Sequence, residues 1–208
     1  MKAIIVAGGD ANITQLKDDL STGSHDLLIA ADSGADHILS AGFVPDVIVG
    51  DFDSISADRS ALTSEIITYP PEKDFTDAEA AFDHAIKSGS DDIVIYGATG
   101  RRLDHFLGNL SLLIKADGLG LKCCIKDEHN VIRLVSSDTT INKSESFGDY
   151  ISVIPIDDNV CISLEGFKYP LDNYRLTRDN ALGVSNEISD DVAYIKLMSG
   201  RVLLIESK

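Results

Sequence analysis

Residues 93–116 read IVIYGATGRRLDHFLGNLSLLIKA, and this stretch indicates the fold class. It begins with Ile93–Tyr96, which is apolar on both faces and rich in β-branched side chains, as buried strands are. A glycine-containing loop follows, and a helix is predicted over Asp104–Ala116. The apolar residues at helical spacing in this helix are Leu107, Leu110, Leu113 and Ile114. A strand, a short loop and a helix in this order are typical of a parallel sheet covered by helices.

The same alternation precedes this stretch. Four more short apolar runs predict buried strands over Lys2–Ala7, Leu27–Ala31, Asp46–Val49 and Ile66–Tyr69. A second helix is predicted over Thr76–Lys87, because Thr76 and Glu79 form a capping-box pattern at its start. Its apolar stripe consists of Ala80, Ala81, Ala85 and Ile86. We therefore expect an α/β domain over residues 1–125, with a mostly parallel sheet and helices on both of its faces.

From about Lys122 the pattern changes to short alternating runs that Gly, Asn, Asp and Ser separate, with no long helix. These runs are Cys123–Lys126, Val131–Val135, Thr139–Asn142, Ile151–Ile156, Val160–Leu164, Tyr194–Leu197 and Val202–Ile205. We expect them to form a smaller C-terminal antiparallel β-sandwich-like domain over residues 126–208.

The charge of the chain excludes several classes of partner. The 208 residues carry a formal net charge of −16, which disfavours binding to nucleic acids and to anionic membranes. Cationic ligands and divalent metals remain suitable partners. The N-terminus lacks the apolar run of a signal peptide, and no stretch is long enough for a membrane helix. Because Cys123, Cys124 and Cys161 form no C-x-x-C motif, a reduced cytoplasm is the expected location.

Polar residues follow several predicted strands directly. They are Asp32, the pair Asp51 and Asp53, and the loop of residues 97–102. In open α/β sheets, ligands bind beyond the carboxyl ends of the strands. We therefore expect these separate segments to meet in one site of the first domain.

The segment Gly50-Asp51-Phe52-Asp53-Ser54 gives the sharpest indication of a metal. Two carboxylates one residue apart at a strand end suit Mg²⁺, which prefers oxygen ligands and substrate phosphates. The alternative is a tight turn in which Asp and Ser bond their own backbone. Asp32 at another strand end favours the metal, because three crowded carboxylates without a cation would repel each other.

The segment before the second helix also carries charged groups. Lys73 suits a phosphate contact, and Asp74 and Asp77 suit a contact with metal or substrate. The structural alternative is that Thr76 caps the helix and Asp77 complements its positive end. Taken alone, this segment favours the structural alternative.

The loop Gly97-Ala98-Thr99-Gly100 leads into a helix and forms a candidate anion cradle of backbone N–H groups. Arg101 and Arg102 add positive charge there, although they would also suit pairing with surface acids. The loop matches neither the dinucleotide fingerprint nor the Walker motif. His105 suits acid–base chemistry or phosphate contact, but a histidine at a helix start is more often structural.

Five segments together resemble the thiamine pyrophosphokinases of bacteria. They are Asp32-Ser33-Gly34-Ala35, Gly50-Asp51-Phe52-Asp53-Ser54, Lys73-Asp74-Phe75-Thr76-Asp77, Gly97-Ala98-Thr99-Gly100 with Arg102-Leu103-Asp104-His105, and Gly183-Val184-Ser185-Asn186. Their order and spacing extend through nearly the whole chain, and five motifs in register are specific where each alone is weak.

The resemblance implies transfer of a pyrophosphoryl group from ATP to the hydroxyl of thiamine, with Mg²⁺, in a homodimer whose active sites lie at the subunit interface. It assigns thiamine binding to Ser185 and Asn186. The catalytic residues that we expect are Asp53, Asp74, Asp77 and Arg102. The metal ligands that we expect are Asp32, Asp51 and Asp53. The residues expected to bind ATP are Asp32, Ser33, Lys73, Thr76, Thr99, Gly100, Arg101, Arg102, Asp104 and His105.

Two departures from the family pattern stand out. Arg101 occupies the second of two paired glycines found in many relatives, and the chain has no Trp to stack on the substrate, as some relatives do. Two other functions remain open at this point. A D-x-D pair such as Asp51 and Asp53 also occurs in metal-dependent glycosyltransferases that use nucleotide sugars, and a non-enzymatic module that binds nucleotide or thiamine would show similar residues.

Overall fold

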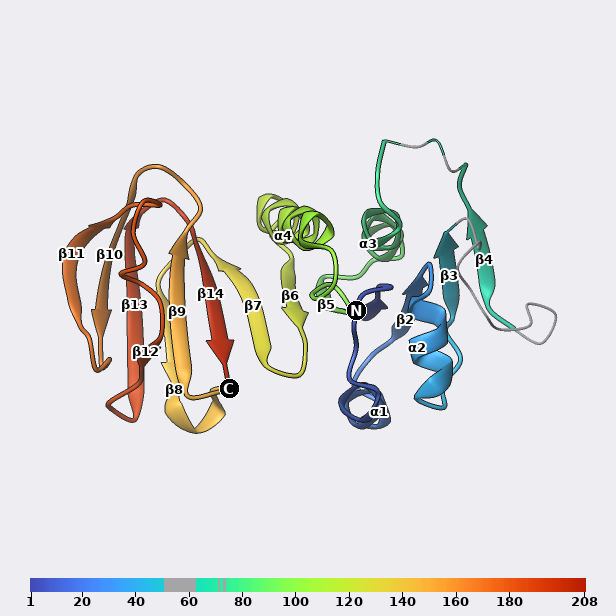
Figure 1. Ribbon diagram of the computed structural model, residues 1–208, viewed down its shortest axis with the longest axis horizontal. Coiled ribbons are helices and arrows are strands. Elements are labelled where there is room, and N and C mark those ends of the chain that lie inside the picture. The colour runs from blue at the N-terminus through green and yellow to red at the C-terminus, as the bar shows by residue number, and fades with distance from the viewer. Residues whose placement is uncertain (51–62, 71, 73) are drawn as a thin grey trace. The chain divides into compact units, whose positions relative to one another are not determined.

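The computed structural model describes residues 1–50, 63–70, 72 and 74–208, which form the helices and strands in Figure 1. The chain divides into two compact units, Met1–Glu128 and His129–Lys208. The expected domain boundary after residue 125 falls inside strand β6 (Lys122–Lys126), the last strand of the first unit.

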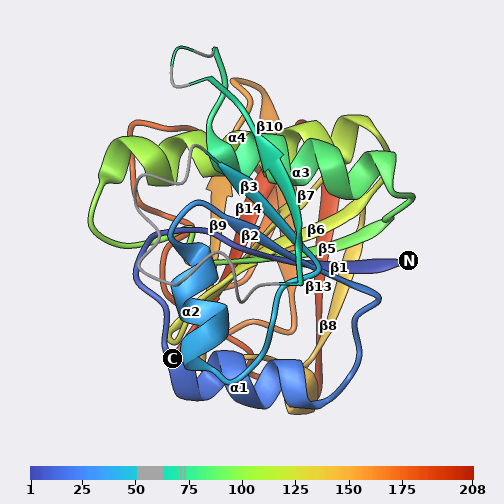
Figure 2. The same ribbon diagram turned by 90° about the vertical axis from the view of Figure 1, so that its right-hand side faces the viewer.

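The first unit contains a parallel sheet with the strand order β6-β5-β1-β2-β3-β4. Besides β6, its strands are β1 (Lys2–Val6), β2 (Leu27–Ala31), β3 (Val47–Gly50), β4 (Glu65–Thr68) and β5 (Asp92–Tyr96). Its helices are α1 (Ile13–Ser21), α2 (Gly34–Ser40), α3 (Asp77–Lys87) and α4 (Leu103–Gly118). Figure 2 shows α3 and α4 on one face of this sheet and α1 and α2 on the other. The expected α/β architecture is confirmed, and each parallel strand sends its carboxyl end to the same edge.

The start of α3 shows the Thr76 half of the predicted capping box, while the Glu79 carboxylate accepts a hydrogen bond from Lys115 Nζ at 3.2 Å. Thr76 is the N-cap, and its side-chain oxygen accepts a hydrogen bond from the backbone N–H of Glu79 at 3.1 Å. The helix buries alanine-rich positions and Phe82 against the sheet. Small side chains let the helix backbone approach the strands closely. This close packing determines the position of the first turn of α3 relative to the sheet.

The buried stripe of α4 differs from the prediction. Leu107 is 62% exposed, and the residues that α4 buries are Asn109, Leu112, Leu113 and Ala116. These follow the i, i+3, i+4, i+7 spacing of one helix face, whereas Leu107 lies on the opposite face. The prediction was right for Leu113 and wrong for Leu107, because counting apolar residues could not include the buried polar Asn109.

Strand β4 also differs from the expectation of a buried strand. Within the described part of the chain it lies at the edge of the sheet and pairs only with β3, and Ile66 is 45% exposed. An edge strand has no neighbouring strand on one side among the described residues. The apolar side chains of β4 are therefore less covered than those of a central strand.

The second unit contains two antiparallel sheets, with the orders β12-β9-β14-β7 and β11-β10-β13-β8. The strands are β7 (Asn130–Val135), β8 (Thr139–Asn142), β9 (Tyr150–Pro155), β10 (Val160–Glu165), β11 (Leu171–Leu176), β12 (Asn186–Glu187), β13 (Val192–Ser199) and β14 (Val202–Ser207), and a 3-10 turn, η2, spans Lys143–Glu145. One cluster of buried apolar side chains from both sheets forms its core. The expected antiparallel unit is confirmed. Sequence patterning missed β11 and β12, and it placed Cys123–Lys126 here, although β6 pairs in parallel with β5 in the first unit.

None of the helices in the described part of the chain combines the length and the apolar character that a membrane crossing requires.

Candidate active site

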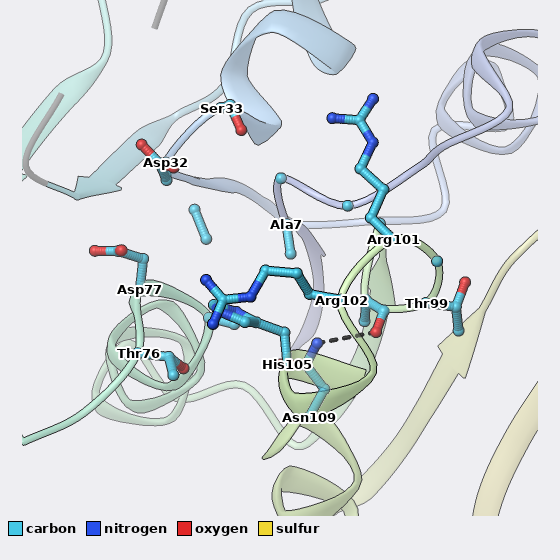
Figure 3. Close-up of a pocket in the computed structure, with 17 residues that line it drawn as sticks. Ala7, Asp32, Ser33, Thr76, Asp77, Thr99, Arg101, Arg102, His105 and Asn109 are labelled. Carbon is cyan, nitrogen blue, oxygen red and sulfur yellow. Dashed lines mark hydrogen bonds between the residues drawn. The ribbon is translucent and has the colours of Figure 1, made fainter. Parts of the chain in front are cut away.

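A pocket of about 350 Å³ lies at the carboxyl ends of β1, β2 and β5 in the first unit (Figure 3). The loops after these strands and the first turns of α3 and α4 line it. The lining residues are Ala7, Gly8, Gly9, Ala31, Asp32, Ser33, Thr76, Asp77, Ala78, Gly97, Ala98, Thr99, Gly100, Arg101, Arg102, His105 and Asn109. The pocket therefore sits where an open α/β sheet binds its ligand.

Two glycine-containing loops lie side by side and form part of the pocket wall. The backbone N–H of Ala7 donates to Tyr96 O at 2.8 Å, and that of Gly9 donates to Gly97 O at 2.9 Å. Gly97 has a φ of +63°, and a Cβ there would lie 2.2 Å from Ala7 O. Any larger residue at position 97 would clash with the backbone of Ala7. Gly97 therefore lets the two loops stay as close together as the paired strands β1 and β5 that precede them.

Asn109 and His37 hold these two loops in place. The Asn109 side chain is buried and donates from Nδ2 to Ala98 O at 2.9 Å, the dashed line in Figure 3. The Nε2 atom of His37 on α2 lies 2.8 Å from Gly9 O. Sequence reasoning missed both residues. An Asn within the apolar part of a helix was a usable signal, whereas nothing in the sequence marked His37.

The acidic side of the pocket is formed by Asp32 and Asp77. Asp32 follows β2 in the left-handed region with a φ of +50°, and its backbone N–H donates to Val49 O at 2.8 Å. Asp77 is the first residue of α3. Figure 3 shows both carboxylates on the same side of the pocket. Folding thus brings together two acids that are 45 positions apart in the sequence.

The basic side is formed by Arg101 and Arg102. Arg102 makes two hydrogen bonds to Asp104, from Nε at 3.1 Å and from Nη2 at 2.5 Å. This guanidinium is the main reason why the pKa of the Asp104 carboxyl falls to about 2. Arg101 instead bonds Asp10 through Nε at 2.6 Å. Both arginines line the pocket and both pair with acids, as the second alternative for this loop expected, and the phosphate contact stays a prediction.

The remaining predicted residues of the first unit lie as follows. Thr76 lines the pocket while its side-chain oxygen caps α3, and Thr99 lines it while its hydroxyl donates to Asp127 Oδ2 at 2.7 Å. Ser33, Gly100 and His105 also belong to the lining. Asp74 is exposed and does not line the pocket. Asp104 does not line the pocket either, but it bonds Arg102 and His105, which do. Asp51, Asp53 and Lys73 lie outside the described residues.

The two predicted thiamine-binding residues lie in the second unit. Ser185 has a φ of +57°, and its backbone N–H donates to Ser152 Oγ at 3.0 Å. Asn186 is buried, and its side chain accepts from Tyr169 N at 3.1 Å and donates to Tyr169 O at 2.8 Å. These bonds fix the backbone of Tyr169, whose side chain is 59% exposed.

Three or more His, Cys, Asp or Glu side chains gathered as for a metal are not found within the described residues. Asp32 and Asp77 nevertheless offer carboxylate oxygens, the ligands that Mg²⁺ prefers. Gly50, the residue before the predicted Asp51 and Asp53 pair, packs against Asp32, since a Cβ on Gly50 would lie 3.2 Å from Asp32 Cα. The donor chemistry of this side of the pocket therefore fits a hard divalent cation.

Comparison with known proteins shows the family of the chain. Residues 20–125 match the family model "Thiamin pyrophosphokinase, catalytic domain", and residues 138–202 match "Thiamin pyrophosphokinase, vitamin B1 binding domain". A thiamine pyrophosphokinase of Bacillus subtilis is 37% identical over 100% of this chain and 99% of its own length. Crystal structures of thiamine pyrophosphokinases from Bacillus subtilis and Geobacillus thermodenitrificans each give a TM-score of 0.86, at 33% and 32% identity. They cover 100% of this chain and 99% and 98% of their own. The chain therefore belongs to the thiamine pyrophosphokinase family.

Proposed function

We propose that this chain transfers the pyrophosphoryl group of ATP to the hydroxyl of thiamine and releases thiamine diphosphate and AMP. One observation carries the proposal beyond family membership. A single pocket at the carboxyl ends of the strands joins two carboxylates, Asp32 and Asp77, to two guanidinium groups, Arg101 and Arg102. Such a combination suits a polyphosphate together with a divalent cation.

The nucleotide phosphates would bind along the loop after β5 and the first turns of α3 and α4. Backbone N–H groups at these turns favour anions, and Arg102 can exchange its Asp104 partner for phosphate oxygens. Thr76, Ser33 and His105 line the same space. Lys73 is proposed as a further phosphate contact on the strength of the sequence resemblance.

The reaction needs alignment more than covalent help from the protein. The thiamine hydroxyl oxygen forms a bond to the β-phosphorus of ATP. The bond between this phosphorus and the oxygen bridging to the α-phosphate breaks, its electron pair stays on AMP, and the hydroxyl proton leaves. Arg102 would neutralise charge on the phosphate oxygens, and Asp77 and Asp74 are candidates for orienting the nucleophile.

Mg²⁺ is the proposed metal, held by Asp32 with Asp51 and Asp53. When bound, it would offset the negative charge of the triphosphate. Asp77 lies on the same side of the pocket as Asp32, so it is a candidate for a ligand of this metal or of its water.

Thiamine would be bound by the pocket together with Ser185 and Asn186 of a partner subunit, in a homodimer. The resemblance supports this arrangement, and the acidic chain suits the cationic thiazolium ring. A cytoplasmic location is proposed with it, since Cys123, Cys124 and Cys161 are all free thiols. No specific observation favours a nucleotide-sugar glycosyltransferase or a passive binding module.

The test is incubation of the protein with ATP, Mg²⁺ and thiamine, followed by chromatography. Thiamine diphosphate and AMP in equal amounts are expected. ATP that stays intact while both ligands bind by calorimetry would instead support the passive module, and release of a nucleoside diphosphate from a nucleotide sugar would support the glycosyltransferase.

Mixing of two variants that are each strongly impaired at low thiamine concentration tests the shared site. Asp77→Asn removes a group of the pocket, and Asn186→Ala alters the proposed thiamine side. If each site combines the two groups from different subunits, refolding the variants together restores one intact site in mixed dimers and hence part of the activity. A mixture as impaired as the separate variants contradicts the shared site.

A further inference from the structure

We propose that Asp10 and Arg101 act as one unit at the pocket rim, in which Arg101 binds phosphate oxygens of the nucleotide and Asp10 positions it. The inference rests on the proposed function, because it assigns a further residue to the nucleotide site. Nothing in the sequence pointed to Asp10.

The pair extends a series of contacts between the β1 and β5 segments. Ala7 N bonds Tyr96 O, Gly9 N bonds Gly97 O, and the next contact outward is that of Asp10 Oδ1 with Arg101 Nε at 2.6 Å. Asp10 also packs on Gly100, where an added Cβ would lie 3.0 Å from Asp10 Oδ2. The Asp10 side chain is 60% exposed, and its carboxylate contacts the loop after β5 at both Gly100 and Arg101.

The backbone of Arg101 is in an unfavourable region for its type. Its φ is +47°, the left-handed region that glycine adopts without steric penalty. A long side chain retained at such a position, beside a ligand pocket, points to a role for the side chain itself. The ion pair with Asp10 is the contact that holds the side chain in the observed direction.

The bonding pattern of the guanidinium indicates the role. Arg101 contacts Asp10 through Nε only, and its two Nη groups bond no other residue in the described part of the chain. Arg102 differs, because Asp104 occupies both its Nε and its Nη2. Two Nη groups side by side match the geometry of phosphate oxygens.

The location of Asp10 indicates that it orients Arg101 and does not compete with the nucleotide phosphates for the guanidinium. Arg101 lines the pocket and Asp10 does not. Because Asp10 lies outside the pocket lining and bonds Arg101 Nε, we infer that it orients the arginine and does not occupy the place of a phosphate. Removal of Asp10 should therefore weaken nucleotide binding, whereas a competing carboxylate would have the opposite effect.

Two single variants and their combination test the unit by calorimetric titration with ATP and Mg²⁺ in the absence of thiamine. Arg101→Gly suits the observed φ, so it should fold normally, and it should weaken ATP binding about tenfold, or about 1.4 kcal/mol. Asp10→Asn should weaken it by several-fold. The double variant should match Arg101→Gly, because Asp10 acts through Arg101. In turnover assays the KM for ATP should rise while kcat and the KM for thiamine stay within about twofold of the original values.

Asp91→Asn is the matched control. Asp91 is an exposed, paired aspartate of the same unit that precedes β5, at the opposite end of the strand from the pocket. Its substitution makes the same change of charge and should leave ATP binding unaltered.

The outcomes are distinct. Normal ATP binding by Arg101→Gly in a chain that makes thiamine diphosphate overturns the role of Arg101 and leaves the proposed function intact. Tighter ATP binding by Asp10→Asn overturns the positioning role. The same holds if Asp10→Asn weakens ATP binding as much in the Arg101→Gly protein as in the unsubstituted protein. An unsubstituted protein that neither binds ATP nor forms product overturns the proposed function and this inference together.

Discussion

The buried side chain of Asn109 donates a hydrogen bond to the backbone carbonyl of Ala98 across 2.9 Å. It thereby ties the middle of α4 to the loop that follows β5. The pocket-lining residues Thr99, Gly100 and Arg101 belong to the same loop. A core position of a helix thus fixes the geometry of the candidate active site.

Substitution of Asn109 should affect stability and activity together. Asn109→Ala leaves the Ala98 carbonyl without its partner, so we expect the free energy of unfolding to fall by about 1–3 kcal/mol and the KM for ATP to rise several-fold. Urea denaturation and steady-state kinetics measure the two effects. Ser111→Ala, on an exposed position of the same helix, should change neither. A fully stable and active Asn109→Ala protein would show that the loop keeps its shape without this bond.

Asp77 should matter for turnover far more than for stability. Asp77→Asn removes a carboxylate from the pocket, and we expect kcat to fall about 100-fold at saturating Mg²⁺. The loss of a negative charge at the start of α3 should lower stability by only about 0.3–1 kcal/mol. Glu79→Gln, in the same helical turn but outside the pocket lining, serves as control. Normal turnover of Asp77→Asn would leave Asp77 with a purely structural role in the helix.

The pKa of Asp104 reports the state of Arg102. The Arg102 guanidinium lowers this pKa from the ordinary 3.8 to about 2. The pair therefore stabilises the fold above about pH 3.8, and this contribution is lost as the pH falls toward 2. In Arg102→Met, NMR titration of the Asp104 carboxyl should give a pKa moved back up toward 3.8.

Nucleotide binding should also raise the pKa of Asp104, because phosphate oxygens would take Arg102 away from this carboxylate. Asp157, whose pKa is lowered by Arg201 in the second unit, is the internal control and should not respond. An Asp104 pKa that stays low when MgATP binds would contradict the exchange of partners at Arg102.

Asn186 should influence thiamine through the backbone of Tyr169. Asn186→Ala breaks two hydrogen bonds to that backbone, so we expect a loss of about 2 kcal/mol in stability and a higher KM for thiamine with an unchanged KM for ATP. Asn180→Ala, the same change at an exposed position of the second unit, should be silent in both assays. An increase in the KM for ATP would place Asn186 outside the thiamine side of the site.

Local sequence patterns were sufficient for the parallel sheet and its best-capped helix. The apolar run of β5 and the Thr76 cap of α3 depend on residues close in sequence, and both appear as predicted. The approach of Asp32 to the loop with Arg102 was also predictable, because parallel strands end at one edge of the sheet, whereas Asp77 begins a helix and strand ends did not indicate it.

Local sequence patterns could not predict the features that depend on tertiary contacts. The bond between Asn109 and Ala98 and the contact between His37 and Gly9 join elements whose approach the sequence does not encode locally. The exposure of Leu107 has the same origin, since the sheet and not the pattern decides which face of α4 is buried. The short strand β12 was missed because its two residues, Asn186 and Glu187, are polar and give no periodic signal.

In the proposed reaction, one pocket aligns a nucleotide for attack on its β-phosphorus. The most direct test is turnover with thiamine, Mg²⁺ and ATP carrying a radioactive label in its γ-phosphate. We predict that all of the transferred label appears in thiamine diphosphate, with unlabelled AMP formed in equal amount. Labelled thiamine monophosphate with ADP as the other product, or label that never reaches thiamine, would contradict the proposal.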